Sequence, residues 1–282
     1  MVKKYLLSTV AALALGFAVS CDNTTDDPPG QDKNGSGSGT TITGPRVLSK
    51  VTVGTLDAEE YITSSGVLSQ ALYKNSAGDV ITGTVTYTGN NITKLKMTDS
   101  KAVHAIDNTY NVTYTNGKIS AITMDQPVVG TTNHSDFTVT YDANGQLYRI
   151  IEKKKMGGSA SYTHYVEYRF TFAASNIAKV DQISTLMIGG NPDMPNAMTM
   201  TYAYDNYDDK INPHTTLPKE YFTIVGTLFS SNFYLLSPNN PGKITVFSSG
   251  TGVATPKTYV YDSQNYPVSD QSQTTKYIYK PL

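Results

Sequence analysis

The residues of this chain that could carry out chemistry are few, and none forms a recognised catalytic motif. The single cysteine, Cys21, excludes an intrachain disulfide, an iron–sulfur cluster and a Cys-rich zinc site. There is no G-x-S-x-G sequence and no Gly-rich phosphate-binding loop between a strand and a helix. A glycosidase pair stays open, because such carboxylates need not be close in sequence, and the available glutamates are Glu59, Glu60, Glu152, Glu167 and Glu220. We predict no enzymatic activity and no cofactor.

Two polar loops, residues 188–196 and 205–218, are the places where binding is expected, since loops on a rigid scaffold usually carry it. Asp205, Asp208 and Asp209 could offer oxygen ligands to Ca²⁺. Their spacing differs from that of a calcium-binding loop, so a solvated polar turn is favoured. Two tyrosines are predicted to lie in turns, where a ring can stack on a sugar. The predicted ligand-binding residues are Tyr207, Tyr266, Asp205, Asp208 and Asp209.

Two further groups of residues have a functional and a structural interpretation. His104, His134 and His164 are 30 residues apart, which would allow a metal-binding row along one edge of a sheet. No H-x-H or H-E-x-x-H pair accompanies them, so we predict solvated histidines and no metal site. The lysines at 153–155 could meet an anionic glycan or a lipid headgroup, but protection of an edge strand is favoured.

The N-terminus has the features of a bacterial lipoprotein. Lys3 and Lys4 precede an apolar run over 6–19, which suits a signal peptide and is short for a membrane span. The sequence Ala18-Val19-Ser20-Cys21 resembles a lipobox, in which small residues precede a cysteine that becomes diacylated; secretion with a spare thiol is the alternative. We predict a signal peptide over 1–20, a lipid on Cys21, and a disordered tether over 21–46 that reaches about 25–30 Å.

Composition and patterning indicate β structure. The net charge of −1 excludes a strongly basic nucleic-acid binder, and the chain has 21 tyrosines but no tryptophan. Residues 137–150 illustrate the pattern: alternating apolar and polar residues flank Asn144-Gly145, a pair that tolerates positive φ in a hairpin turn. After Val47 no stretch shows convincing helical periodicity, although residues 55–62 could form one helical turn.

The hairpin unit recurs along the chain. An aromatic residue ends each first strand, at steps of 27, 27, 31, 32, 30 and 27 residues: Tyr87, Tyr114, Tyr141, Phe172, Tyr204, Tyr234 and Tyr261. A polar turn and an aliphatic residue follow each one: Ile92, Ile119, Leu147, Ile177, Ile211, Ile244 and Val268. Such a period indicates a repeat architecture. We predict one all-β domain over 47–282, a long antiparallel meander of roughly 14 to 16 strands. It should curl into a half-barrel, a clam or a superhelical ribbon with an apolar concave face.

The units resemble the tyrosine–aspartate (YD) repeats of Rhs-type surface proteins. The resemblance rests on Tyr141-Asp142 with Gly145-Gln146-Leu147, on Tyr114 with Gly117-Lys118-Ile119, and on Tyr261-Asp262. Asp follows the aromatic residue in three of the seven copies, and the chain is too short for the large enclosing shell of that family. Together with the lipobox, it looks like the YD-like lipoproteins of unknown function on Gram-negative envelopes. The resemblance implies a β-rich envelope protein and carries over no catalytic residue.

Three hypotheses about function follow. The first is a protein held by a lipid on the outer membrane, facing the surface or the periplasm, that binds or scaffolds a glycan, a peptide or a protein. The second is a carrier whose curled sheet encloses a lipid or another hydrophobic ligand. The third is an unrecognised enzyme, which would need a cleft near residues 188–218.

Overall fold

The computed structural model describes residues 45–64, 66–101 and 106–282. The sheet strands are β1 (Arg46–Val53), β2 (Leu56–Ser64), β3 (Val67–Lys74), β4 (Val80–Thr88), β5 (Asn91–Asp99), β6 (Asp107–Thr115), β7 (Lys118–Val128), β8 (Thr131–Tyr141), β9 (Leu147–Lys155), β10 (His164–Ala173), β11 (Asn176–Ile188), β12 (Asn191–Pro192), β13 (Met198–Tyr207), β14 (Pro241–Ser248), β15 (Thr251–Pro256), β16 (Val260–Tyr261), β17 (Pro267–Ser269) and β18 (Thr275–Pro281). The helical elements are η1 (Met194–Asn196), η2 (Pro213–Thr216), α1 (Lys219–Leu228) and η3 (Ser230–Leu236).

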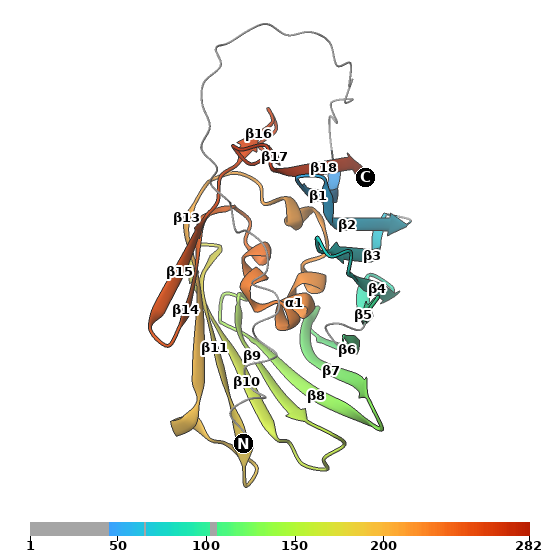
Figure 1. Ribbon diagram of the computed structural model, residues 1–282, viewed down its shortest axis with the longest axis vertical. Coiled ribbons are helices and arrows are strands. Elements are labelled where there is room, and N and C mark those ends of the chain that lie inside the picture. Colours follow the sequence, from blue (N-terminus) through green and yellow to red (C-terminus); the bar gives the residue numbers. More distant parts are fainter. Residues whose placement is uncertain (1–44, 65, 102–105) are drawn as a thin grey trace, which may run out of the picture. The chain divides into compact units, whose positions relative to one another are not determined.

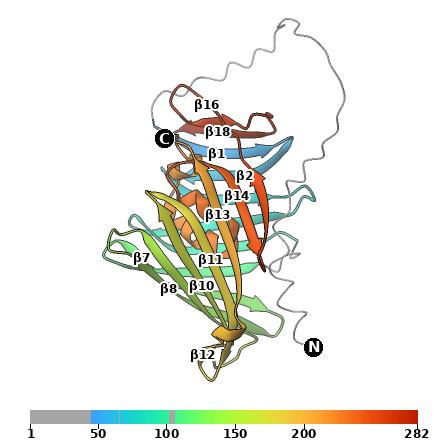
Figure 2. The same ribbon diagram turned by 90° about the vertical axis from the view of Figure 1, so that its left-hand side faces the viewer.

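All 18 described strands belong to one antiparallel arrangement, in which most strands pair with their neighbours in sequence. β1 lies between β2 and β18, so the first and last strands of the described chain are adjacent. At the other end β11 pairs with β13, which is followed by β14 and β15. Figures 1 and 2 show the strands following one another around a strong curve. The prediction of an all-β antiparallel meander that curls is confirmed; the short strands β12, β16 and β17 account for the excess over the expected count.

The hairpin unit is clearest between β2 and β11. Tyr87, Tyr114, Tyr141 and Phe172 lie at or next to the ends of β4, β6, β8 and β10, and the aliphatic residues after them are the first or second residues of the next strands. A register shift immediately precedes each aromatic position, for example between Thr113 and Tyr114. Such a shift increases the local twist, which helps the sheet to curl.

The aspartate of the Tyr-Asp pair has a structural role in the turn. Asp142 Oδ1 accepts hydrogen bonds from the backbone N–H groups of Asn144 and Gln146, at 2.9 and 2.8 Å. Asp262 accepts from Gln264 and Tyr266 in the same way, at 2.9 and 3.0 Å. The two-residue turn at Asn116-Gly117 needs no such acceptor, because both residues have positive φ. In the turn after Asp142 only Gly145 has positive φ, so the positive φ expected at Asn144 is not observed.

The helical segment Asn212–Leu236 is the main departure from the prediction. Tyr234, expected at the end of a strand, lies in η3, and Ile211 lies outside any strand. The expected helical turn at 55–62 is instead β2. Helix α1 has only ten residues and is buried from Tyr221 to Gly226, so the polar row of Lys219, Thr223 and Thr227 gives too short a 3.6-residue pattern to mark a helix. Its β-branched residues resemble those of a strand.

The helical segment packs on the concave face of the sheet and fills it (Figure 1). Phe233 is fully buried, with ring centroids 5.5 Å from Tyr168 and 4.9 Å from Phe170. The Tyr168 hydroxyl donates to the carbonyl of Thr227, at 3.1 Å, in the last turn of α1. The Tyr204 hydroxyl donates to the carbonyl of Ser231, at 3.1 Å. The Tyr168 hydroxyl therefore satisfies a carbonyl group that the end of α1 leaves without an intrahelical donor, and the Tyr204 hydroxyl adds a second link between the sheet and the start of η3.

Candidate functional site

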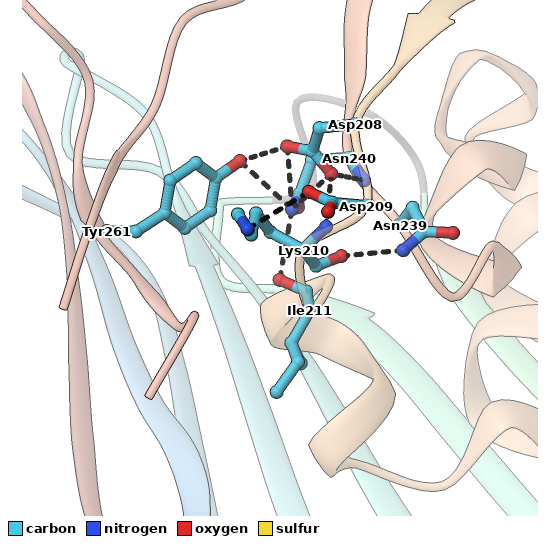
Figure 3. Close-up of polar contacts among 7 residues, drawn as sticks. All are labelled: Asp208, Asp209, Lys210, Ile211, Asn239, Asn240 and Tyr261. Carbon is cyan, nitrogen blue, oxygen red and sulfur yellow. Dashed lines mark hydrogen bonds and ion pairs between the residues drawn. The ribbon is translucent and has the colours of Figure 1, made fainter. Parts of the chain in front are cut away.

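The predicted ligand-binding aspartates follow β13, where the chain turns toward η2. Asp208 is the central residue of this region (Figure 3). Its Oδ1 accepts hydrogen bonds from the backbone N–H groups of Lys210 and Asn240, at 3.0 and 3.1 Å. Its Oδ2 accepts from the hydroxyl of Tyr261. The carboxylate thus joins three stretches of chain that are far apart in sequence.

Asn239 and Asn240 complete this connection. The side-chain amide of Asn240, which is buried, donates to the carbonyl of Ile211 at 3.0 Å. The side-chain amide of Asn239 donates to the carbonyl of Lys210 at 2.8 Å (Figure 3). The polar groups of the segment 208–211 therefore already have partners within the chain, which favours a structural role for this cluster.

The three aspartates do not converge on a common point. Asp205 pairs with Lys243 on the neighbouring strand β14, at 3.0 Å. The side chain of Asp209 is 85% exposed and pairs with Lys210 at 3.1 Å; the hydrogen bond and the charge of this lysine lower the pKa of the carboxyl. Asp208 turns inward to Asn240 and Tyr261. Among the described residues no group of three or more His, Cys, Asp or Glu side chains could hold a metal ion.

The two predicted sugar-stacking tyrosines are engaged in the fold. Tyr207 is the last residue of β13 and not part of a turn; its hydroxyl donates to the carbonyl of Ile177 at 2.8 Å. Burial raises the pKa of this hydroxyl. Tyr266 does lie in a turn, but the guanidinium of Arg46 stacks 4.5 Å from its ring centroid. Arg46 also donates to Asp262 at 2.6 Å, so Tyr266 covers a partly buried ion pair.

The histidines do not form a row. His134 is opposite Lys155 and His164 is opposite Lys154, so the two histidines lie on opposite faces of the sheet. The hydrogen bond to Asp125 raises the pKa of His134, and burial lowers the pKa of His164. His104 lies outside the described residues, as does Cys21. The lysines at 153–155 belong to β9, which has a partner on each side, so their predicted role in edge protection is wrong.

The glutamates do not form a glycosidase pair in β9 and β10. Glu152 is opposite Val166, whereas Glu167 is opposite Ile151, so the two carboxyl groups lie on opposite faces of the sheet. Glu152 is buried, accepts from the Ser135 hydroxyl at 2.6 Å, and has a pKa raised by burial. Glu167 is bound by Arg169 at 2.8 Å and 3.0 Å on its two oxygens.

The loops 188–196 and 205–218 lie at opposite ends of β13. This strand covers ten residues, which corresponds to roughly 30 Å at the usual rise of a strand. A single cleft formed by both loops together is therefore incompatible with the described fold.

Two hollows were not anticipated from the sequence, because each draws its lining from several elements. The smaller has a volume of about 200 Å³ and lies between the β2–β3 and β4–β5 turns and the start of α1. The hydroxyl of Tyr87, which lies at this hollow, has no hydrogen-bond partner among the described residues. Burial and the nearby charge of Glu220 raise the pKa of that hydroxyl. The larger hollow, about 470 Å³, is more open and lies around Lys118, whose ammonium group is 4.9 Å from the ring centroid of Tyr141.

Comparisons with known proteins give little further information. No protein-family model matches the chain, and no curated protein matches it. Among solved structures, a porin-like protein from Bacteroides vulgatus ATCC 8482 is similar with a TM-score of 0.47 and 13% identity, over 84% of this chain and 100% of that chain. A porin-like protein from Bacteroides uniformis ATCC 8492 has a TM-score of 0.38 and 14% identity, over 82% of this chain and 94% of that chain. Similarity at this level says nothing about function. No helix in the described part of the chain is long and apolar enough to cross a membrane.

Proposed function

We propose that this chain is a lipid-anchored protein of a Gram-negative cell envelope that binds or scaffolds a glycan, peptide or protein partner without catalysing a reaction. The anchor is supported by the sequence around Cys21 and the outer-membrane placement by its resemblance to envelope lipoproteins. The observation that carries the binding role is the filled concave face. Because Phe233 and the rest of the helical segment occupy it, recognition falls to the outer surfaces and margins of a rigid sheet.

Anchoring is tested by expressing the full chain in a Gram-negative host. Mass spectrometry of the mature N-terminus should show a diacylated Cys21, and the protein should fractionate with the outer membrane. Cys21→Ser should release it in soluble form while leaving its circular dichroism unchanged. Protease accessibility in intact cells then determines whether the domain faces the surface. An uncleaved N-terminus, or release of the wild type in soluble form, would contradict the anchor.

Binding is tested separately on arrays of envelope and dietary glycans and of peptides. We expect retention of at least one class of ligand, with no turnover of it. Lys118→Ala and Tyr87→Phe report whether either hollow contributes, and Thr84→Ala, on an exposed strand position, is the matched control. Hydrolysis of a polysaccharide that is lost in Glu152→Gln or Glu220→Gln would show that the chain is an enzyme.

The carrier hypothesis gains no support from the geometry. The volume that a hydrophobic ligand would occupy holds the chain's own helical segment; the hollow of about 200 Å³ is smaller than a usual ligand pocket, and the one of about 470 Å³ is open to solvent. We expect no stoichiometric lipid in solvent extracts of the purified protein.

A further inference from the structure

The strand β15 forms a margin of the sheet in Figure 1. Its only described ladder is the one with β14, from Ser248↔Thr251 to Lys243↔Pro256. The two strands are joined by Ser249-Gly250, both with positive φ, which makes a two-residue hairpin turn. Residues flanking such a turn form a hydrogen-bonded pair, and bonded pairs alternate from there along the ladder.

This alternation determines which backbone groups face outward. Thr251, Val253 and Thr255 use their N–H and C=O groups toward β14. The next position in this series, Lys257, donates its backbone N–H to Gly242 at 2.9 Å, which confirms the alternation. The N–H and C=O groups of Gly252 and Ala254 therefore point away from β14, and both residues are exposed.

β15 also lacks the features that normally protect an edge strand. Residues 251–256 carry no charge, and the ladder with β14 has no register shift. The strand β16 contrasts with it: it is two residues long, and the hydroxyl of its Tyr261 is bonded to Asp208. In β15 only Pro256 interrupts the row of donors, at the end of the strand.

The exposed side chain at the centre of β15 completes the argument. The concave face carries a row of apolar residues through paired strands, Val180, Tyr202, Val246 and Val253. The first is fully buried and the third is half-buried, but Val253 is 68% exposed. The apolar row thus ends at an open edge with a side chain that a further strand would cover.

We propose that β15 pairs antiparallel with β15 of a second copy of this chain, around a two-fold axis at Val253. Gly252 of each copy then lies opposite Ala254 of the other, and the two pairs exchange four backbone hydrogen bonds. The two Val253 side chains meet on the concave face. Pro256 falls opposite Gly250 of the other copy, beyond the end of its strand, so its missing N–H costs no ladder bond. A longer strand from another protein would lie opposite Pro256 and find no N–H group there, which is why a second copy of this chain fits better.

The test uses the full chain carrying Cys21→Ser, with its mass followed by analytical ultracentrifugation over a range of concentrations. The parent should show a reversible monomer–dimer equilibrium. Val253→Lys and Val253→Glu should each weaken dimerisation by about 10- to 100-fold, since like charges would meet at the axis and the apolar contact is lost. An equimolar mixture of these two variants should recover a dimer containing one copy of each.

Ala254→Pro removes one outward N–H that makes no bond to β14, and should abolish dimerisation. Ala254→Val keeps that N–H and is the matched control. Val253→Cys in the same background should form an intermolecular disulfide, whereas Thr255→Cys should not, because its counterpart lies four positions away in this register. A parent that stays monomeric at its highest soluble concentration, or a dimer that persists in both Val253→Lys and Ala254→Pro, would overturn the proposal.

Discussion

The hairpins from β2 to β11 and the helical segment Asn212–Leu236 share one hydrophobic core but are held in it differently. Each hairpin is specified locally, by an alternating strand, a turn and a second strand that pairs with the first. The helical segment has no such local partner. Its position depends on side chains from distant strands, such as Tyr168 and Tyr204, that bind its carbonyl groups. Local order should therefore survive changes that loosen the helical segment.

The largest effect is expected where the helical segment enters the core. Phe233→Ala would leave a cavity against Tyr168 and Phe170, and should lower the free energy of unfolding by about 3–5 kcal/mol. Thr84→Ala, on an exposed position of β4, should change it by less than about 0.5 kcal/mol. Urea denaturation followed by circular dichroism measures both. Equal effects of the two substitutions would show that the helical segment contributes little to the core.

A second prediction concerns a contact between the two regions. A Cβ on Gly83 of β4 would lie 2.8 Å from Met97 Sδ and 2.9 Å from the hydroxyl oxygen of Tyr221 in α1. Gly83→Ala should therefore cost about 1–3 kcal/mol of stability through overpacking. The same substitution in a Tyr221→Phe background should cost less, with a coupling of at least about 0.5 kcal/mol in a double-mutant cycle. Full additivity would mean that Tyr221 is not the residue that requires a glycine at this position.

Two glutamates of the hairpins have opposite pKa shifts; one is paired with the helical segment and the other with a neighbouring strand. Glu59 lies 2.9 Å from Nε2 of His214 in the helical segment and accepts from the Tyr61 hydroxyl at 2.8 Å. Burial alone would raise its pKa, but the charge and hydrogen bond of His214, the hydrogen bond of Tyr61 and the charge of Lys257 together outweigh this, and the pKa is lowered from its usual 4.5. A lowered pKa means stability that is present above pH 4.5 and lost as the pH falls through the folded-state value. Glu59→Gln should cost about 1–3 kcal/mol at pH 7 and progressively less in acid.

Glu152, within the hairpins, should behave in the opposite way. Burial raises its pKa above 4.5, so ionisation penalises the folded state as the pH rises from that value. Glu152→Gln keeps a side-chain oxygen for the Ser135 hydroxyl and should increase stability at pH 7. Below about pH 4 it should have no effect, because the carboxyl group of the wild type is then protonated in both the folded and the unfolded state. Denaturation curves between pH 3 and 8, taken for both glutamine variants, compare a carboxyl group that contacts the helical segment with one that contacts only strands. Parallel pH profiles for the two variants would refute the assigned shifts.

The smallest effects are expected in the turns. Asp142→Ala removes an acceptor from two backbone N–H groups in an exposed turn and should cost about 1 kcal/mol. Asp262→Ala makes the same change but also leaves the buried Arg46 without its 2.6 Å partner, so about 2 kcal/mol is expected. Replacement of either aspartate by asparagine, which retains an acceptor oxygen, should cost less in each turn. A larger loss at Asp142 than at Asp262 would contradict the role given to Arg46.

The hairpins could be predicted because their signals are local. Tyr141, Leu147 and the residues between them place two strands and a turn within a short window, and the structure confirms them. Helix α1 could not be predicted in this way, because it has only ten residues and its buried centre leaves few polar positions to mark a helix in a sequence. Tyr234 illustrates the error: it has the right spacing from Tyr204, but its partners are in the core and it is not paired in a strand.

The candidate site shows the same limit. Asp208 was identified from the sequence as a polar residue in a loop, but its partners Asn240 and Tyr261 are 32 and 53 residues further along the chain. Only folding brings these three together, and it turns a possible calcium ligand into a structural connection. Tyr207 and Tyr266 likewise changed from candidate binding residues to packed ones, because Ser237 and Arg46 reach them from distant segments.

By itself the sequence determined the period-two alternation, the hairpin repeat and therefore the antiparallel meander, since these depend on neighbours in the chain. Only the tertiary structure decided that the meander curls around a helical segment and that β15 is left with an open edge. It also decided that one polar loop lies at each end of β13. The physical reason is that burial and backbone pairing between distant segments are set by the packing of the whole sheet, and no short window of residues contains that information.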